Sequence, residues 1–563
     1  MFKHYTMNQV ILPLDLEIKL QENDIAFAVN DLVESIPNEA FDIFVRQTGC
    51  PSYHPRMMMK VILCAYTQSV FSGRKIEALL KDSVRMMWLA QGYEPTYRSI
   101  NRFRSNPAVK ELLRQSFVQF RCKLIETNQI DEEALFIDGT KIEANANKFT
   151  FVWRKSIEKY SENLVSKSNQ LYDELLEKEI IPAIERESSE ELSTNELETI
   201  TQKLDKTIET YTEKIEGSED VGDRKQWRSE RKEPKYYRKQ FADFVVRKEK
   251  YKQNMKIFEQ RNSYSKTDHD ATFMRMKDDY MQNGQLKAGY NLQIATEGQY
   301  ALAYDLFPNP TDTRTLAPFL DTIEENYFSL PKYIVADAGY GSEQNYDDIL
   351  NNRKRVPLIT YNLYRKEKKK KFREDPFNTA NWTYHSDTNS YVCPNEKQLN
   401  YLYESTRTDR YGFKRTFKVY ECEDCTGCPL RELCTKAKEG TNRRLYQNAK
   451  WESQKEYVRE KLSDKKTGEI YRKRKIDVEP FFGFLKANLG FTRLSLRGQS
   501  KAHNELGFAL LAVNLRKFTA NNVKTPMNPN DDKNKNGSIY DKTVSRTIFY
   551  LVRLVMSQPL LFC

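Results

Sequence analysis

Residues 135–148 read LFIDGTKIEANANK, where an apolar run delivers a single carboxylate, Asp138, and Gly139 follows at once. A short apolar run of this kind is typical of a buried strand that presents its acid at an exposed end. An Asp-Gly pair after a strand is also an ordinary turn. The same pattern recurs at residues 333–342, YIVADAGYGS, where Asp337 ends a second β-rich run. Two such acids, joined by a third acid on a basic helical stretch, predict a metal-binding cluster.

Composition and charge limit the classes of protein to which the chain can belong. Its 563 residues are enough for three or four domains, and 90 Lys+Arg against 79 Asp+Glu give a net charge of +11. That excess suits an acidic partner, but a solvated surface explains it equally well. The sequence has neither a signal-peptide pattern nor an apolar run of the roughly 20 residues that span a bilayer. We therefore expect a cytoplasmic protein, without membrane contact, whose nine cysteines are thiols or metal ligands.

The first 125 residues are expected to form a helical domain. Three arginines, Arg98, Arg102 and Arg104, fall within one short segment, TYRSINRFRSN. A helix that ends in clustered arginines is compatible with helix-turn-helix docking to DNA. A plain helical bundle with a solvated basic face is the equal alternative.

Residues 149–260 are highly charged and almost free of glycine, and they interrupt the β-rich part of the chain. Their apolar residues recur at alternating three- and four-residue steps: Leu197, Ile200, Leu204, Ile208, Tyr211 and Ile215. This spacing predicts an inserted antiparallel helical hairpin or a short coiled coil.

Residues 261–375 return to β-character. GYNLQIAT and YALAYDLF, separated by EGQ, predict a β-hairpin, residues 313–327 a helix and VPLITYN a further strand. With residues 126–148, this order predicts an α/β fold in which helices flank a mixed sheet. The run RKEKKKKFR at 365–373 is either a solvated loop or a contact to a phosphate backbone. Residues 451–520 should add C-terminal helices to this core, and residues 521–563 a tail that packs on the body.

Five cysteines gather in residues 376–450, four of them in the segment CEDCTGCPLRELC. Two overlapping Cys-x2-Cys steps let pairs of thiolates face one tetrahedral ion, so the pattern favours a small zinc-ribbon-like insertion that holds structural Zn²⁺. An iron–sulfur cluster and unligated buried thiols are the lesser alternatives. The ligand set that we favour is Cys393, Cys425, Cys428 and Cys434, with Cys422 as the alternative ligand.

The third acid is expected in residues 471–497, YRKRKIDVEPFFGFLKANLGFTRLSLR. Glu479 and Lys486 are seven residues apart, so on one helix they share a face. An amphipathic surface helix with an ion pair explains the same spacing, and Asp477 and Glu469 are rival acids. Pro480 predicts that Glu479 lies near a helix start or a kink. The region stays cationic through Lys475, Arg493 and Arg497, which we consider candidate DNA contacts.

Taken together, these blocks resemble the DDE transposases of bacterial insertion sequences. The branch concerned has an InsH-type N-terminal domain and a cysteine-rich segment before the catalytic glutamate. YHPRMMMKVILCAYTQSVFSGRKIEALL and TYRSINRFR are similar to the N-terminal domain, FIDGTKIEANANK and DAGYGS to the two aspartate blocks, and VEPFFGFLKANLGFTRLSLRG to the glutamate block. In the family's Tyr-x2-Arg-x3-Glu-x6-Lys signature, Glu479 and Lys486 keep their spacing, while Lys475 stands at the arginine position and Arg472 at the tyrosine position.

The resemblance implies a ribonuclease-H-like fold in which Asp138, Asp337 and Glu479 hold two Mg²⁺ (or Mn²⁺) ions and Lys486 contacts phosphate. The partner implied is double-stranded DNA, both the element's terminal inverted repeats and the target, bound by a homodimer or larger assembly in the nucleoid. The reaction expected is cleavage at the element's ends, followed by attack of the freed 3′-OH on target DNA. Two alternatives stay open: a zinc-containing DNA-binding or regulatory protein without catalysis, and a structure-directed nuclease without strand transfer.

Overall fold

A computed structural model of the chain describes residues 20–45, 48, 51–188, 190–276 and 284–522. Its centre is a six-stranded sheet in the order β4-β5-β1-β7-β8, with β6 also paired to β5. β1 pairs with β5 antiparallel and with β7 parallel, while β5 and β6 form the predicted hairpin. The prediction of a mixed sheet among helices is therefore confirmed. The strands of this core sheet are β1 (Ala134–Glu143), β4 (Thr272–Arg275), β5 (Leu286–Glu297), β6 (Tyr300–Phe307), β7 (Tyr333–Ala336) and β8 (Val356–Ile359).

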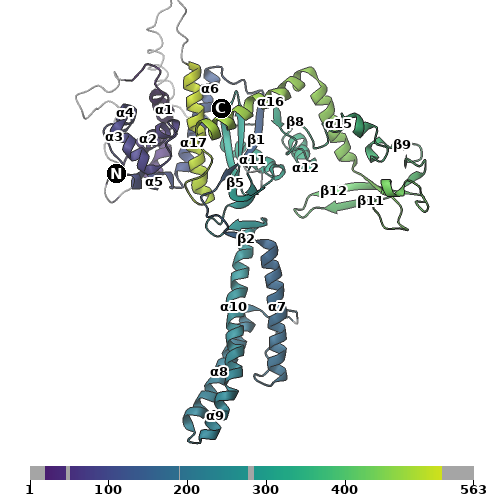
Figure 1. Cartoon of the computed structure of the whole chain (residues 1–563). Helices are drawn as coiled ribbons and strands as arrows, with labels where there is room; N and C mark the ends of the chain where they lie inside the picture. Colours follow the sequence, from purple (N-terminus) through teal and green to yellow (C-terminus); the bar gives the residue numbers. More distant parts are fainter. Residues whose placement is uncertain (1–19, 46–47, 49–50, 189, 277–283, 523–563) are drawn as a thin grey trace, which may run out of the picture.

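The N-terminal region is helical, as predicted, and it is joined to the core sheet by the long helix α17 (Gln499–Asn522), which packs against α2, α6 and β6 (Figure 1). Asn514 of α17 holds the sheet directly. Its Oδ1 accepts from the Ala301 amide at 2.9 Å, and its Nδ2 donates to the Ala301 carbonyl at 2.7 Å. One continuous hydrophobic core therefore runs from the N-terminal helices through the sheet to α17. The helices of the N-terminal region are α1 (Ile25–Glu34), α2 (Pro55–Thr67), α3 (Gly73–Asp82), α4 (Val84–Ala90), α5 (Tyr97–Arg104) and α6 (Val109–Glu126). Two further helices, α11 (Leu316–Asn326) and α12 (Glu343–Asp347), lie between the strands of the core sheet in the sequence.

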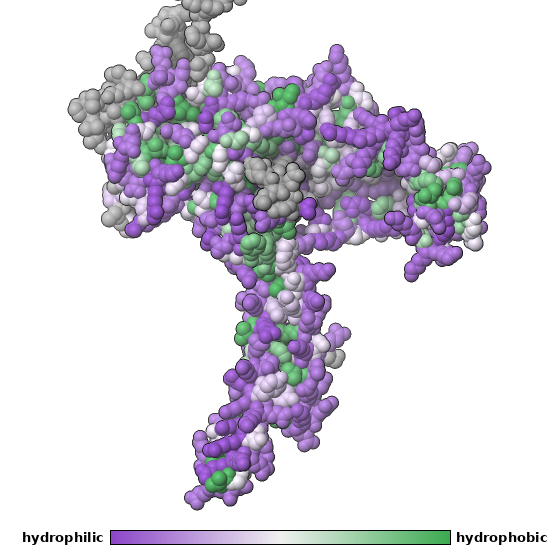
Figure 2. Space-filling model, in the orientation of Figure 1, coloured by the Kyte–Doolittle hydropathy of each residue, from purple (hydrophilic) through white to green (hydrophobic). Residues whose placement is uncertain are grey.

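The predicted helical insertion is an arm that projects from the body (Figure 1). Instead of one hairpin, it contains α7 (Arg154–Glu177), α8 (Thr194–Gly217), α9 (Val221–Glu230) and α10 (Lys232–Phe258). α10 packs against both α7 and α8, and the first half of the predicted seam is buried between them. The arm leaves the body at the two-stranded sheet of β2 (Phe151–Trp153) and β3 (Ser263–Ser265). Hydrophilic residues cover most of its surface (Figure 2).

The cysteine-rich residues form a separate lobe built on a five-stranded sheet in the order β13-β12-β11-β10-β9. Two helices, α15 (Ala449–Ser463) and α16 (Lys465–Gly483), carry the chain from this lobe back to the core sheet (Figure 1). The lobe contains β9 (Thr383–His385), β10 (Ser390–Val392), β11 (Gln398–Thr408), β12 (Lys414–Cys422), α14 (Arg431–Cys434) and β13 (Arg444–Gln447), and α13 (Lys370–Arg373) lies before it in the cationic run.

Two predictions concern the remainder of the chain. The packed tail falls almost entirely on residues 523–563, which lie outside the described residues. Among the helices that are described, we find none with the length and apolarity needed to cross a membrane.

Candidate active site

The register of the core sheet aligns Asp138 and Asp337. In the parallel pair of β1 and β7, Ala134 stands opposite Tyr333 and Phe136 opposite Val335. The same register continued by two residues sets Asp138 opposite Asp337. β7 ends at Ala336, directly before Asp337, as predicted. β1 instead runs on to Glu143, so Asp138 lies within the strand, opposite Ile294 of β5, and the expectation that it ends its strand is wrong.

Glu479 joins these two acids from α16, which packs against β1 and β7. Asp138, Asp337 and Glu479 line one open cavity of about 520 Å³, together with Lys486 and Arg474. The structure thus brings together the four residues that the sequence analysis selected as catalytic. Asp138 is 8% exposed, and its Oδ1 accepts from the Gly139 amide at 2.7 Å. Glu479 is exposed and lines the cavity from α16.

Arg474 supplies the cavity with the charge that the sequence analysis assigned to Lys475. Its Nη1 lies 3.7 Å from Asp138 Oδ2, with only 11% of the side chain exposed. Lys475 is exposed on α16 and does not line the cavity. The signal for Arg474 was present in the sequence, because Arg474 shares a helical face with Ile470, Val478 and Phe481, all buried.

Pro480 lies inside α16, so the expectation that Glu479 is near a helix start is wrong. A proline in a helix interior leaves the carbonyl four residues earlier without its donor. Here that carbonyl, on Ile476, accepts a hydrogen bond from Gln299 Nε2 at 3.0 Å, and the turn between β5 and β6 thus replaces the missing donor. The helix then continues as a π-helical turn at Phe484–Asn488, which carries Lys486. The alternative expectation, a kink, agrees with this distorted end.

A fourth acid, Asp312, lies beside Asp138 and Asp337 and was missed in the sequence. Its Oδ1 accepts from Asn291 Nδ2 at 2.7 Å and from Gln293 Nε2 at 3.1 Å, both from fully buried side chains of β5. A Cβ on Gly139 would lie 2.8 Å from Asp312 Oδ1, so only glycine allows this approach. The available signal was the pair of amides two residues apart on an otherwise apolar strand, because buried amides need polar partners.

The electrostatic character of this site is seen at Tyr340, whose hydroxyl donates to Gln293 Oε1. Burial raises the pKa of Tyr340 well above its ordinary value, and the charges of Asp312, Asp138 and Asp337 act in the same direction. Three carboxylates therefore lie close enough to the Tyr340 hydroxyl to disfavour its charged form. Such a site favours cations, although no group of three or more His, Cys, Asp or Glu side chains in the described ranges is arranged to hold a metal ion.

The predicted DNA-contact arginines are in different situations. Arg104 is 3% exposed, and its guanidinium donates to Tyr66 Oη, to the Phe71 carbonyl and to Asn101 Oδ1 at 2.7–2.8 Å. The prediction for Arg104 is therefore wrong, because this side chain holds the N-terminal helices together. Arg98 and Arg102 are exposed on α5.

Arg493 and Arg497 are also exposed, and they fasten the end of β1. Arg493 Nη2 donates to the Ala146 carbonyl at 3.2 Å, and Arg497 Nε donates to the Asn145 carbonyl at 2.8 Å. Both arginines thus secure the segment that follows the Asp138 strand. They are close enough to the candidate site to stay candidates for DNA contact.

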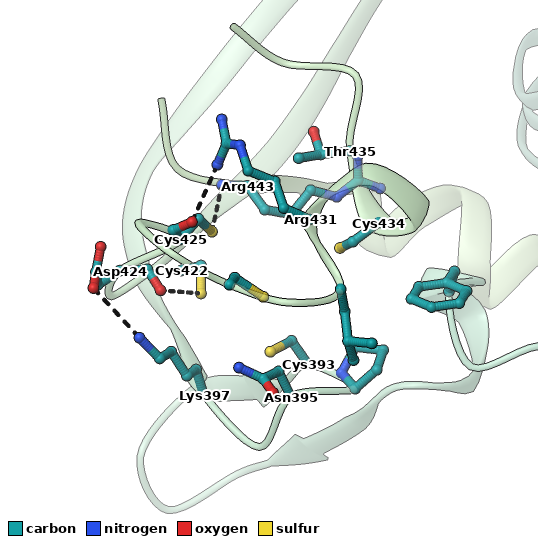
Figure 3. A pocket seen from close by; sticks show the side chains of 14 residues that line it. Cys393, Asn395, Lys397, Cys422, Asp424, Cys425, Arg431, Cys434, Thr435 and Arg443 are labelled. Atoms are coloured by element: carbon teal, nitrogen blue, oxygen red, sulfur yellow. Dashed lines mark hydrogen bonds and ion pairs between the residues drawn. The ribbon is translucent and has the colours of Figure 1, made fainter. Parts of the chain in front are cut away.

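The five cysteines of the lobe line one small cavity of about 20 Å³ (Figure 3). Burial raises the pKa of the Cys422 thiol to about 12, and its hydrogen bond with Cys425 acts in the same direction. Burial raises the pKa of Cys434 as well. The cysteines are neighbours, as their spacing predicts, but the part of the chain that the structure describes contains no ready-made metal-ligand group. The geometry therefore does not support the zinc prediction.

Comparison with known protein families adds two matches. A family model described as a transposase DDE domain matches residues 392–519, which include Glu479 and Lys486. A second model, described as a transposase domain (DUF772), matches residues 14–106 of the N-terminal helical region. No curated protein matches the chain. Two transposase models on one chain, with Asp138 and Asp337 between the segments that they match, support its assignment to the DDE transposases of the insertion-sequence type.

Proposed function

We propose that this transposase cleaves DNA at the ends of its element and joins the freed 3′-OH ends to target DNA, with Asp138, Asp337 and Glu479 as its catalytic carboxylates. The observation that carries the proposal is that these three acids, distant in sequence, line one cavity at one edge of the core sheet. The order of parallel and antiparallel strands is also what a ribonuclease-H-like fold requires, which a DDE transposase implies.

Divalent cations, Mg²⁺ or Mn²⁺, are the cofactor that the donor set fits, since carboxylates and water are the ligands that these ions prefer. When two such ions are bound, they activate a water or a 3′-OH and stabilise the leaving oxygen of an in-line displacement. Asp138, Asp337 and Glu479 would hold them. In the unliganded chain, Arg474 offsets part of the negative charge beside Asp138.

The other residues of the cavity act on the DNA and on the acids themselves. Lys486 lines the same cavity as Glu479, where its ammonium group can pair with a phosphate next to the scissile bond. Asn291 and Gln293 hold Asp312 against Gly139 of β1, directly beside Asp138. Arg98 and Arg102 of the N-terminal region, together with Lys475, Arg493 and Arg497, would contact the backbone of double-stranded DNA. We expect the working complex in the nucleoid to contain at least two copies of the chain.

The test compares two exposed glutamates on one helix. Glu479→Gln removes a carboxylate from the cavity, while Glu469→Gln removes one from the same helix outside it. The substrate is a plasmid carrying the DNA that flanks the coding sequence on both sides. With Mg²⁺, we expect Glu479→Gln and Asp138→Asn to lose cleavage at least about 100-fold and Glu469→Gln to change it less than about twofold. All three variants should bind the DNA as the wild type does in a mobility-shift assay.

Each alternative function has its own outcome. Cleavage that survives Asp138→Asn refutes the assignment of the site. Wild-type protein that binds but never cuts in Mg²⁺ or Mn²⁺ indicates a regulatory protein. Pre-cut ends with a free 3′-OH that are never joined to target DNA indicate a nuclease without strand transfer.

Structural zinc in the cysteine lobe is proposed from the Cys-x2-Cys spacing and from the shared cavity, not from ligand geometry. Elemental analysis of the purified protein should find about one zinc per chain, and the double variant Cys425→Ser with Cys428→Ser should lose it. Protein that contains no zinc and keeps a folded lobe would contradict this proposal.

A further inference from the structure

The β11–β12 hairpin extends from the cysteine-rich lobe toward the core sheet (Figure 1). Along β11, Leu399 is buried in the lobe, but the residues beyond it are largely exposed. Tyr401, Leu402 and Tyr403 expose between 41% and 48% of their surface. A two-stranded ribbon with this much exposed aromatic surface gains little from its own packing, and such a surface is typical of a binding site.

One face of the hairpin combines aromatic rings with an arginine. Tyr403 pairs with Val419, Phe417 with Ser405, and Tyr446 of β13 with Val419, so their side chains point to the same side. Arg407 lies on that side too, with its guanidinium carbon 4.2 Å from the Tyr446 ring centre and 5.4 Å from that of Phe417. We call Tyr403, Arg407, Phe417 and Tyr446 the aromatic face.

Several cations of the hairpin have no ion pair within the part of the chain that the structure describes. Arg407 stands directly opposite Arg415 across the strands, an arrangement that like charges disfavour. Arg415 is paired with Glu343 and Asp409. Within the described residues, the ion pairs do not involve Arg407, nor Arg410, Lys414 and Lys418 of the same hairpin. An anionic partner would satisfy these cations.

The hairpin is fixed next to the candidate active site. Arg415 Nε lies 3.4 Å from Oε2 of Glu343, a buried residue at the start of α12, six positions after Asp337. At the tip, the ring of Tyr411 lies under the guanidinium of Arg314, two positions after Asp312. Both contacts are made to segments that directly follow acids at the sheet edge. DNA held in the cavity would therefore pass close to the aromatic face.

Given the DNA substrate that the proposed function assigns, we propose that the aromatic face binds unpaired bases of the DNA strand beside the cleavage site. Exposed rings interleaved with unpaired cations are the combination by which proteins bind single strands, through base stacking and phosphate pairing. A duplex keeps the faces of its bases stacked inside, so it offers these rings nothing beyond its phosphates. The face therefore discriminates single-stranded from double-stranded DNA.

The test measures binding of a 20-nucleotide thymidine strand to the full-length protein by fluorescence anisotropy. Each measurement is made without added Mg²⁺ or Mn²⁺, so it does not depend on cleavage, and without a chelator, so any zinc in the lobe is kept. Tyr403→Ala and Tyr446→Ala should each weaken this binding about 5- to 100-fold, and Tyr403→Phe should restore it. Binding of a duplex of equal length should change less than about twofold in the same variants.

The matched control is Tyr401→Ala. Tyr401 is 41% exposed on the same strand, but a bulge turns it to the opposite side, against Tyr420. Loss of single-strand binding in Tyr401→Ala equal to that in Tyr403→Ala would overturn the inference, as would equal losses for single strand and duplex. Wild-type protein that does not bind the strand also overturns it. If the wild type binds and Tyr403→Ala does not, the inference stands even where no cleavage is found and the proposed function fails.

Discussion

Replacing Glu297 with glutamine should stabilise the core sheet at neutral pH, by an amount that shrinks as the pH falls. Glu297 ends β5 and is 7% exposed, and its Oε1 accepts from the amides of Asp131 and Glu132 at 3.1 and 2.8 Å. Burial raises the pKa of this carboxyl to about 8, and its hydrogen bond with the Asp131 side chain acts in the same direction. The folded protein therefore holds a proton here that the unfolded chain releases above its ordinary pKa of 4.5.

The sign of the effect follows from this difference in bound protons. Between pH 4.5 and about 8, unfolding releases a proton, so the wild type loses stability by up to about 1.4 kcal/mol for each unit that the pH rises. Glutamine keeps the shape of the protonated acid, accepts the same two amides and has no charge at any pH. The cavity around Glu297 is open to water, so solvent screening makes the change in stability per pH unit smaller than this upper value. We expect the advantage of Glu297→Gln to grow by about 2 kcal/mol between pH 5 and pH 7 and to level off above pH 8.

The assay is urea unfolding of wild type and variant at several pH values, followed by hydrogen exchange in peptides from β5 and β6. Peptide-level detection is needed because a chain of several domains does not unfold in a single step. Glu469→Gln, an exposed acid on α16, should show no such pH dependence. A stability difference that stays constant from pH 5 to pH 8 would refute the protonated state of Glu297.

Three further substitutions test other contacts. Gly507→Ala should destabilise the protein by about 1–3 kcal/mol through overpacking, because the new Cβ would lie 2.2 Å from Tyr304 Oη and 2.8 Å from Leu113 Cδ1. Thermal melting measures this loss of stability, and an unchanged melting midpoint would contradict the prediction. Asn514→Leu should destabilise the sheet by about 2–5 kcal/mol, since the amide and carbonyl of Ala301 both lose their partner, and the Ala301 amide should exchange faster with solvent. Arg474→Gln should reduce cleavage about 100-fold, whereas Lys475→Gln, one position along α16, should leave cleavage within about twofold; equal effects would contradict the placement of Arg474 at the site.

The core sheet and its acids were accessible from sequence because they depend on local patterns. An apolar run followed by Asp predicts a buried strand, and β1 and β7 are buried where those runs stand. The predicted strand end is found at Asp337 but not at Asp138, because β1 continues to Glu143 beside β5. The parallel register of β1 and β7 still sets the two acids side by side. The same reasoning fails for the arm, where a seam of apolar residues indicates helical packing but does not reveal how many helices share it. α10 enters the arm's core through Tyr237, Phe241 and Phe244, whose four- and three-residue steps carry a heptad signal that the sequence analysis did not use.

Sequence patterns misjudge the roles of individual arginines. The physical reason for this is the same for Arg104, Arg474 and Arg407. A guanidinium binds carbonyls, carboxylates, aromatic faces and phosphates equally readily, so its role is decided by the groups that tertiary packing places around it. The Arg104 guanidinium donates its hydrogen bonds to acceptors within the protein, and the Arg474 guanidinium is paired with Asp138 at the sheet edge. Among the described residues, the Arg407 guanidinium contacts aromatic rings and faces an opposing arginine, with no acceptor for its hydrogen-bond donors, which a ligand could use. A cationic residue is therefore a sound candidate for DNA contact where the fold leaves it without a protein acceptor, and clustering in sequence does not supply that information.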